Sequence, residues 1–218
     1  MRRPNNSDLR NDLSWNSPRL LEIEREWGRA RAPSNVDSGD RYGWGIEQLA
    51  RIVKSRLSKE EIRRVAGSCA TMPAERDERS AFADGLLQAI VIVSVETGDR
   101  QALTALLATR YPEQLFIDYD TESYIVAQGK ELQDPILVLF EAYSQSKDPK
   151  VQVKIAAAVR HAFAASGVVG KADSEFLKNA ETWYKRRKDQ LERNLEYNHN
   201  VITEDYDHVP LFRMKQPR

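Results

Sequence analysis

The stretch DPILVLFEAYSQSKDPKVQVKIAAAVRHAFA, residues 134–164, holds two apolar segments that are separated by an Asp-Pro pair. In the second segment apolar residues recur at every fourth position from Val151 to Phe163, which is the spacing of one helix face. The Asp-Pro pairs at 134–135 and 148–149 are typical of helix starts, because aspartate caps free N–H groups and proline fits the first helical position. The stretch therefore predicts two antiparallel helices joined by a tight turn.

Two earlier parts of the chain show the same organisation. Residues 44–72 contain two apolar helical segments, and Ser58 and Glu61 at their junction have the spacing of a capping box. A further helix pair is expected on the two sides of Asp99, whose side chain is suited to cap the second helix. When Ser58, Asp99 and Asp148 are aligned, at offsets of 41 and 49 residues, apolar positions of the neighbouring helices coincide.

This spacing and the residues of the third pair resemble a HEAT repeat. HEAT and armadillo arrays repeat a helix pair every ~40–47 residues. Residues 134–164 have Asp-Pro at the turn, the valine-plus-base pair Val153-Lys154, and small alanines in the second helix. Ser58 and Asp99 lack the following proline, and lysine replaces the usual arginine after the valine. The resemblance implies stacked helix pairs with a concave surface that is typically used for binding.

Two all-α architectures remain open: antiparallel helix pairs stacked as a short HEAT-like array, or an irregular helical bundle. The apolar run LLQAIVIVSV at 86–95 is rich in β-branched residues, but no partner strand is evident, so we expect a buried helix. The other expected elements are a helix that starts at Ser17-Pro18, a connection at 111–133 with one short helix inside, and a long amphipathic helix within 171–198.

The pattern divides the chain into three parts. Residues 1–16 are expected to form a polar N-terminal arm, and residues 17–198 a single all-helical domain. Residues 199–218 are expected to form an extended, polar C-terminal tail. A chain of 218 residues is long enough for one domain with a sizeable core.

Charge and cysteine content restrict the class of protein. Lys+Arg and Asp+Glu are both 33, so the formal net charge is zero and a strongly basic nucleic-acid footprint is missing. The single cysteine, Cys69, excludes an intrachain disulfide framework, and its apolar helical context predicts a buried, inert thiol. The polar N-terminus does not resemble a secretory signal, and the run at 86–95 is too short to span a bilayer. We therefore expect a cytoplasmic protein that does not contact a membrane.

Motifs for enzymatic chemistry are weak. The acidic residues Asp118, Asp120 and Glu122 form the most distinctive loop, and together with His161 they define the enzyme alternative: a site of carboxylates acting as acid and base. His199 and His208 lie in an acidic tail that could hold a cation, although a solvated tail explains them more simply. Neither a phosphate-binding glycine loop nor a metal-binding HExxH pattern is present. No cofactor and no metal are expected.

The densest basic run suggests a different alternative. Residues 185–188 read Lys-Arg-Arg-Lys, and Arg186 could join Arg193 and the Arg63-Arg64 pair in a patch for nucleic-acid phosphates. A solvated helix face explains such a run more simply, because neighbouring acids partly neutralise it. Nucleic acid is therefore an alternative partner that the sequence does not favour.

The sequence favours a non-enzymatic scaffold or adaptor subunit that binds another protein. Two regions supply the expected binding residues: the tyrosine-rich connection, and the charged last helix together with the tail. The tail segment VPLFRMK combines apolar anchors with cations, so it is suited either to dock on a partner or to pack along its own chain. The predicted partner-binding residues are Tyr119, Tyr124, Arg186, Arg187, Leu211 and Phe212.

Overall fold

The computed structural model describes residues 14–30, 32–37, 40–72, 79–112, 114–116, 119–164, 166–193 and 211–215. In these residues it contains nine α-helices, three short 3₁₀ turns and two antiparallel strand pairs of two or three residues per strand. The helices are α2 (Pro18–Arg29), α3 (Arg41–Arg56), α4 (Lys59–Ser68), α5 (Ser80–Glu96), α6 (Arg100–Thr109), α7 (Thr121–Gln128), α8 (Leu137–Gln145), α9 (Pro149–Ala162) and α10 (Asp173–Arg187). The expected all-α fold is confirmed.

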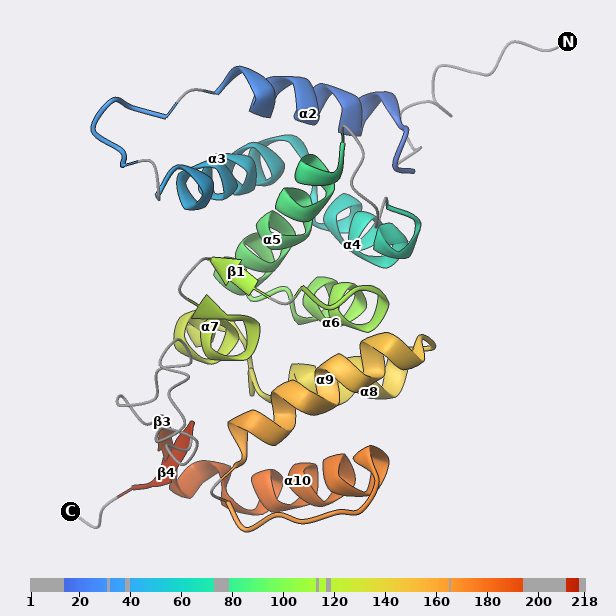
Figure 1. The fold of residues 1–218 in the computed structure, drawn as a ribbon, viewed down its shortest axis with the longest axis vertical. Coiled ribbons are helices and arrows are strands. Elements are labelled where there is room, and N and C mark those ends of the chain that lie inside the picture. Colours follow the sequence, from blue (N-terminus) through green and yellow to red (C-terminus); the bar gives the residue numbers. More distant parts are fainter. Residues whose placement is uncertain are drawn as a thin grey trace, which may run out of the picture.

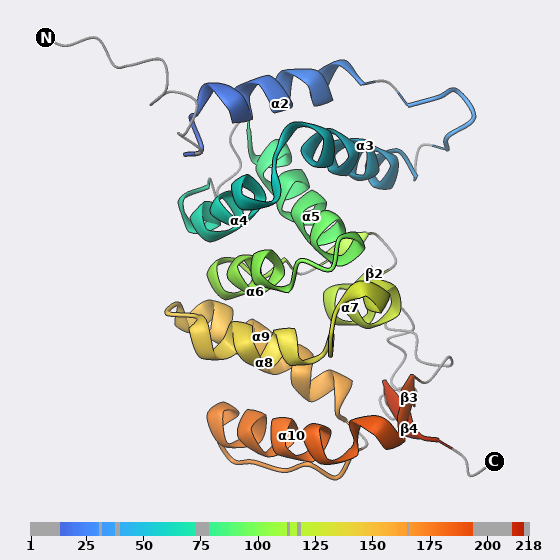
Figure 2. The same ribbon diagram turned by 180° about the vertical axis from the view of Figure 1, so that it is seen from behind.

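The helices form layers along one long axis. Helix α2 covers one end of the stack and α10 the other, and successive helices fill the layers between them (Figures 1 and 2). Helix α3 packs against α5, and α4 packs against α6 in the next layer. Most helices therefore bury their apolar faces against helices that are close to them in the sequence, as stacked helix pairs do.

Side-chain caps fix where four helices begin. Ser17 accepts a hydrogen bond from Leu20 N–H at the start of α2, with proline at the first helical position. Ser58 and Glu61 form the predicted capping box of α4, with Ser58 N–H donating to Glu61 Oε2 at 2.7 Å. The predicted caps of α6 and α9 are also confirmed, since Asp99 and Asp148 accept backbone N–H bonds in the first turns. Capping of this kind satisfies donors that the helix itself cannot pair.

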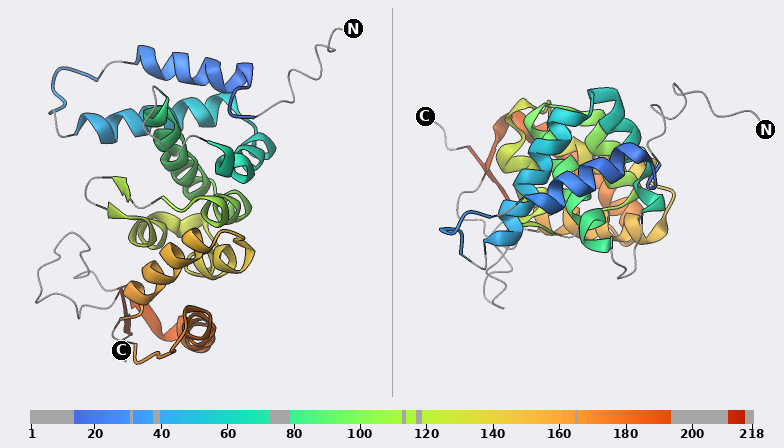
Figure 3. Two further views of the ribbon diagram at one scale, coloured as in Figure 1. Left: turned by 45° about the vertical axis from the view of Figure 1, so that its right-hand side comes forward. Right: turned by 90° about the horizontal axis from the view of Figure 1, so that it is seen from above.

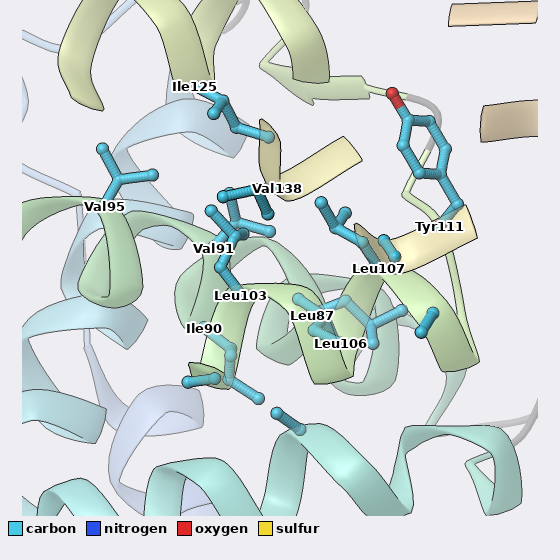
Figure 4. Packing of buried hydrophobic residues seen from close by; sticks show 14 of the residues in the cluster. Leu87, Ile90, Val91, Val95, Leu103, Leu106, Leu107, Tyr111, Ile125 and Val138 are labelled. Carbon is cyan, nitrogen blue, oxygen red and sulfur yellow. The ribbon is translucent and has the colours of Figure 1, made fainter. Parts of the chain in front are cut away.

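Helix α5 is the buried helix that the apolar run predicted. Every residue from Leu86 to Val95 is buried, because α5 lies among α3, α6 and the segment that contains α7 (Figure 4). The β-branched residues of the run meet leucines of α6, including Leu103 and Leu107, in one continuous core. Among the described residues, no helix is long and apolar enough to cross a membrane.

The turn between α5 and α6 presses against the next segment of the chain. Gly98 has a φ of 64°, and a Cβ at this position would lie 2.6 Å from the backbone oxygen of Glu131 in the 3₁₀ turn η2 (Gly129–Glu131). Only glycine combines this left-handed backbone with so close an approach. The turn is thereby locked between two layers.

The third helix pair is placed differently from the first two. In a regular array α8 would lie against α5 and α9 against α6, but α8 packs mainly on α6. Its start also differs from the expected Asp134-Pro135. Asp134 takes a positive φ of 51° and is not the cap, and α8 begins at Leu137. The regular stacking of like helices therefore extends over two pairs.

Both ends of the helical domain depart from the expected boundaries. Trp15, which we placed in a polar arm, stacks on Phe82 of α5 with ring centroids 5.5 Å apart, and the Arg79 guanidinium lies over its ring. At the other end α10 does not continue toward residue 198. It stops at Arg187, and after the 3₁₀ turn η3 (Lys188–Gln190) the chain enters strand β3 (Leu191–Arg193), which pairs with β4 (Phe212–Met214).

Candidate binding sites

A groove between three helices brings one predicted residue together with unpredicted ones. Tyr124 of α7 lines a hollow of about 460 Å³ whose other walls come from α3 and α5. The lining residues are Glu47, Ala50, Arg51, Lys54, Ile92, Glu96 and Tyr124. We call these seven residues the Tyr124 groove. The volume is in the range of pockets that hold a small ligand or a few side chains.

The Tyr124 groove has an apolar floor and charged walls. Ala50 and Ile92 are almost completely buried, so each shows only a small apolar surface to the groove. Lys54 Nζ lies 3.0 Å from Glu96 Oε2, and about half of each of these side chains is exposed. Arg51 and Glu47 form a second, looser pair at 3.9 Å. The walls thus offer both signs of charge on side chains that remain accessible to solvent.

The phenol of Tyr124 stays protonated over the whole neutral range. Burial, together with the nearby carboxylates of Glu96 and Glu47, raises its pKa to about 12. A neutral phenol both donates and accepts a hydrogen bond and presents an apolar ring. This is the chemistry of a contact residue, since an ionised phenolate would be needed for a tyrosine nucleophile.

Tyr119, the other predicted tyrosine, begins the strand β2 (Tyr119–Asp120), which pairs with β1 (Gln114–Phe116) close to α5 and α7. Its side chain lies outside the described part of the structure, so its role stays a prediction. Position 118 is likewise outside the described residues, and so is the side chain of Asp120.

The enzyme alternative was a site that joins the acidic residues at 118–122 to His161. Of its residues, the structure places Glu122 beside His161: Oε1 of the buried carboxylate is 3.5 Å from the imidazole Nδ1. Tyr111, also buried, donates its hydroxyl proton to the other oxygen of Glu122 at 3.3 Å. The cluster links α7, α9 and the end of α6. A carboxylate held by two neighbours in this way is also the normal means of satisfying a buried acid.

The structure does not bring Arg63 and Arg64 together with Arg186, as the alternative phosphate patch required (Figure 1). Arg63 and Arg64 belong to α4, and the layers of α6 and of α8 with α9 separate that helix from Arg186 on α10 (Figure 1). Arg63 instead binds Asp99 with its Nε 3.0 Å from both carboxylate oxygens. An arginine committed to a buried acid inside the fold is not available for phosphates.

Most of the basic run is engaged within the chain. Lys185 pairs with Glu181 at 2.7 Å, and Lys188 pairs with Asp134 at 2.7 Å. The guanidinium of Arg187 lies 5.2 Å from the ring centroid of Trp183, which is a cation–π distance. Arg186 is exposed on α10. Binding by Arg186 and Arg187 remains a prediction.

The two predicted tail residues pack back on their own chain. Leu211 is fully buried, and the Phe212 ring lies 5.8 Å from the rings of Phe163 and Tyr184. This is the second of the two behaviours that the sequence left open for the tail. A role of Leu211 and Phe212 in binding a partner stays a prediction, and it requires the tail to leave this position.

Two further hollows were missed by sequence reasoning. One, of about 430 Å³, is lined by Arg19, Arg25, Arg29 and Arg56 with two glutamates of α2. The other, of about 390 Å³, contains Gln88, whose buried Oε1 has no hydrogen-bond partner among the described residues. Arg19, Arg25 and Arg29 recur at spacings of six and four along α2, so the sequence alone could have indicated a basic surface on this helix. The second hollow joins residues from four segments and leaves no such signal.

Cys69 fits the predicted inert thiol. It is fully buried, and burial raises its pKa to about 12. Its Sγ–H donates to the carbonyl oxygen of Val65 at 3.2 Å. Among the described side chains no group of three potential metal ligands comes together.

Comparisons with protein-family models, with curated proteins and with solved structures found no match to this chain. The fold and the sites define the class directly. The chain is an all-α protein of layered helices with a polar groove on its side and a tail strand packed at one end.

Proposed function

We propose that this chain is a non-enzymatic, HEAT-like helical protein that binds another protein through the Tyr124 groove. The observation that carries the proposal is the composition of this groove: an apolar floor, a neutral tyrosine and exposed charges of both signs. Interfaces between proteins typically combine an apolar centre, aromatic anchors and a polar rim. An extended partner segment with one apolar side chain between two charged ones would complement these walls.

The packing of the first two helix pairs supports the HEAT-like part of the proposal. Helix α3 on α5 and α4 on α6 repeat one arrangement with a period that arrays of this kind use. Polar ties join the layers: Arg63 binds Asp99, and the Thr109 hydroxyl donates to the carbonyl of Ala66 at 3.2 Å. The groove lies on the side of this regular part, where α3, α5 and α7 meet.

A site-specific photo-crosslinker tests the proposal. We would replace Tyr124 by p-benzoylphenylalanine in the full chain and, as a matched control, replace the partly buried Tyr143 of α8 in the same way. Illumination in the native host should link position 124 to one protein of defined mass, and position 143 should not. The product should disappear when Lys54→Glu reverses the charge of one wall.

The control for charge reversal is Lys59→Glu, an exposed lysine at the start of α4 outside the groove. It should leave the crosslink at position 124 unchanged. If both positions give the same products, or if the product survives Lys54→Glu, the Tyr124 groove is not the binding site and the proposed function fails.

A further inference from the structure

The hollow of about 390 Å³ joins four segments of the chain that follow one another along the stack. Its polar residues come from α3, from α5, from the end of α6 and from α9, which lie in that order along the long axis (Figure 3). They are Tyr42, Asp84, Gln88, Arg110 and Lys154. We call the hollow lined by these five residues the Gln88 hollow. It shares no residue with the Tyr124 groove.

Gln88 interrupts the apolar part of α5. The run from Leu86 to Val95 is otherwise apolar except for one serine, and Gln88 is only 8% exposed. Its Nε2 donates to the Tyr42 hydroxyl at 2.9 Å, but its Oε1 has no hydrogen-bond partner among the described residues. A buried acceptor without a partner lowers stability, so leucine would serve the fold better at this position. The unpaired oxygen therefore points to a ligand that donates a hydrogen bond.

Gln88 and Tyr42 together offer an acceptor and a donor. In the free chain Oε1 of Gln88 is shielded from solvent. The torsion χ3 of glutamine is broad, so a rotation of the carboxamide brings this oxygen to the hollow without a movement of α5. The Tyr42 hydroxyl accepts the Nε2–H bond and keeps its own proton for a ligand. Burial raises the pKa of Tyr42, so this proton is present at neutral pH.

The charged residues of the hollow select an anion. Arg110 lies beside Asp84, with Nη2 3.4 Å from Oδ1, and Lys154 is exposed on α9. The two cations and the one carboxylate leave a single positive charge in the lining. Guanidinium and ammonium groups form charge-assisted hydrogen bonds with carboxylates. One positive charge matches one carboxylate, whereas a phosphate ester carries almost two negative charges at neutral pH.

The rest of the lining is apolar and nearly buried. Leu87 and Pro112 contribute small apolar surfaces. Tyr111 has its hydroxyl bound to the carboxylate of Glu122 at 3.3 Å, so it adds mainly its ring. The volume of about 390 Å³ is near the lower end for small-ligand pockets. A ligand with one small apolar group would fill this space.

We propose that the Gln88 hollow binds a small monocarboxylate that carries an N–H group next to its carboxylate and a small apolar side chain. An N-acyl amino acid has this chemistry, and so does the C-terminal residue of a polypeptide. The N–H donates to Gln88 Oε1, and the carboxylate accepts from Lys154, Arg110 and the Tyr42 hydroxyl. The proposal goes beyond the function proposed above, because it concerns a separate surface.

Three matched probes test the proposal in proton–nitrogen correlation spectra of the full chain. N-acetyl-L-leucine has both recognised groups, isocaproate lacks the N–H, and N-acetyl-L-leucinamide lacks the carboxylate. N-acetyl-L-leucine should shift the side-chain amide signal of Gln88 and bind at least about tenfold more tightly than either of the other two. Equal affinities for the three probes, or no shift of the Gln88 signal at the highest soluble concentration, would overturn the proposal.

Two variants of the hollow separate ligand binding from a structural role. Gln88→Leu should raise the Tm of the free chain by about 2 °C and remove the preference for N-acetyl-L-leucine over isocaproate. A lower Tm with an unchanged preference would show that the amide serves only the fold, which contradicts the proposal. Lys154→Gln should weaken binding of N-acetyl-L-leucine about fivefold or more. Its matched control is Lys178→Gln at an exposed position of α10, which should bind as the wild type does.

A fourth probe distinguishes the two sources of the ligand. Acetyl-Ala-Ala-Leu with a free carboxylate represents the C-terminus of a polypeptide. Binding at least about tenfold tighter than that of N-acetyl-L-leucine assigns the hollow to a polypeptide terminus, since a longer segment gains further contacts. Equal or weaker binding assigns it to a small molecule, and either result supports the proposed chemistry. The crosslink at Tyr124 is measured independently, so failure of the Gln88 hollow and failure of the Tyr124 groove are separate outcomes.

Discussion

The block α3–α6 and the end of the chain after α8 are held together in different ways. In the first block two helix pairs stack in the same order, and polar ties between residues 36 and 43 positions apart join the layers. At the other end α10 contacts α9 and, more weakly, α8, and a tail strand from much later in the sequence covers its last turn. We infer that a residue in α6, which has packed helices on both sides, contributes more to the free energy of unfolding than a residue in the terminal helix α10.

The largest expected effect comes from truncating a leucine in α6. Leu106 of α6 is fully buried, and its helix has neighbours on both sides. Leu106→Ala should lower the free energy of unfolding by about 4 kcal/mol, since large-to-small core changes lose both transfer energy and packing. Urea denaturation should show a smaller loss, about 2 kcal/mol, for Leu177→Ala in the terminal helix α10. The reverse order would contradict this inference.

The next largest effect is expected at Asp99, which caps helix α6 and also forms an ion pair with Arg63 of helix α4. Asp99 accepts the N–H of Ala102 and binds Arg63 with both oxygens, in a nearly buried position. Asp99→Ala should cost about 2 to 3 kcal/mol, because the cap is lost and the guanidinium loses its partner. Asp148→Ala removes a cap alone and should cost about 1 kcal/mol.

A double-mutant cycle divides these contributions. Combining Asp99→Ala with Arg63→Ala should recover part of the loss, because the second change removes the stranded charge. Equal losses for Asp99→Ala and Asp148→Ala would mean that the tie between layers contributes nothing.

Alkaline pH should lower the free energy of unfolding through one group in each region, and the two groups should act in different pH ranges. The pKa of Cys69 in the first block is raised from 9.0 to about 12, and that of Tyr184 in the last helix from 10.0 to about 12, both by burial. As pH rises, the unfolded chain loses these protons first, so the free energy of unfolding falls through each window. Between pH 8 and 10 the thiol should account for a loss of about 1 kcal/mol.

One variant for each group identifies the pH range in which that group affects the free energy of unfolding. Cys69→Ala should flatten the pH dependence of urea unfolding from pH 8 to 10, while Tyr184→Phe should alter it only above about pH 10. If Tyr184→Phe changes the slope below pH 10 and Cys69→Ala does not, the assignment of the two windows is wrong.

The smallest effect is expected for the exposed ion pairs. Lys54–Glu96 ties α3 to α5, and Lys185–Glu181 lies within α10. Both pairs are largely solvated, so double-mutant cycles should give less than about 0.5 kcal/mol for each. The two regions should not differ here, and a value above about 1 kcal/mol for Lys54–Glu96 would show a buried contribution that its exposure does not suggest.

Local signals in the sequence were sufficient for most helices and for four of their starts, but not for the start of α8. Ser17, Ser58, Asp99 and Asp148 all cap helices as predicted, because a cap depends only on residues within one turn. The buried helix at 86–95 was also predictable, since an uninterrupted apolar run without partner strands has few other solutions.

What the sequence did not reveal depends on contacts between distant residues. Helix α10 ends at Arg187, although the apolar spacing continues, because Leu191 pairs with Met214 across more than twenty residues. Of the candidate site, only Tyr124 was predicted. Its groove partners belong to α3 and α5, and no periodicity within one segment shows that these helices would converge on it.

The place of the last strand in the sequence has a further consequence for the order of folding. Leu191 pairs with Met214 and Arg193 with Phe212, so strand β3 has no partner until almost the whole chain has been synthesised. Pairings between residues far apart in the sequence form slowly, because the closure of the intervening loop costs entropy before any contact is gained. The rings of Phe163 and Tyr184 should therefore be among the last in the core to acquire their final neighbour, Phe212.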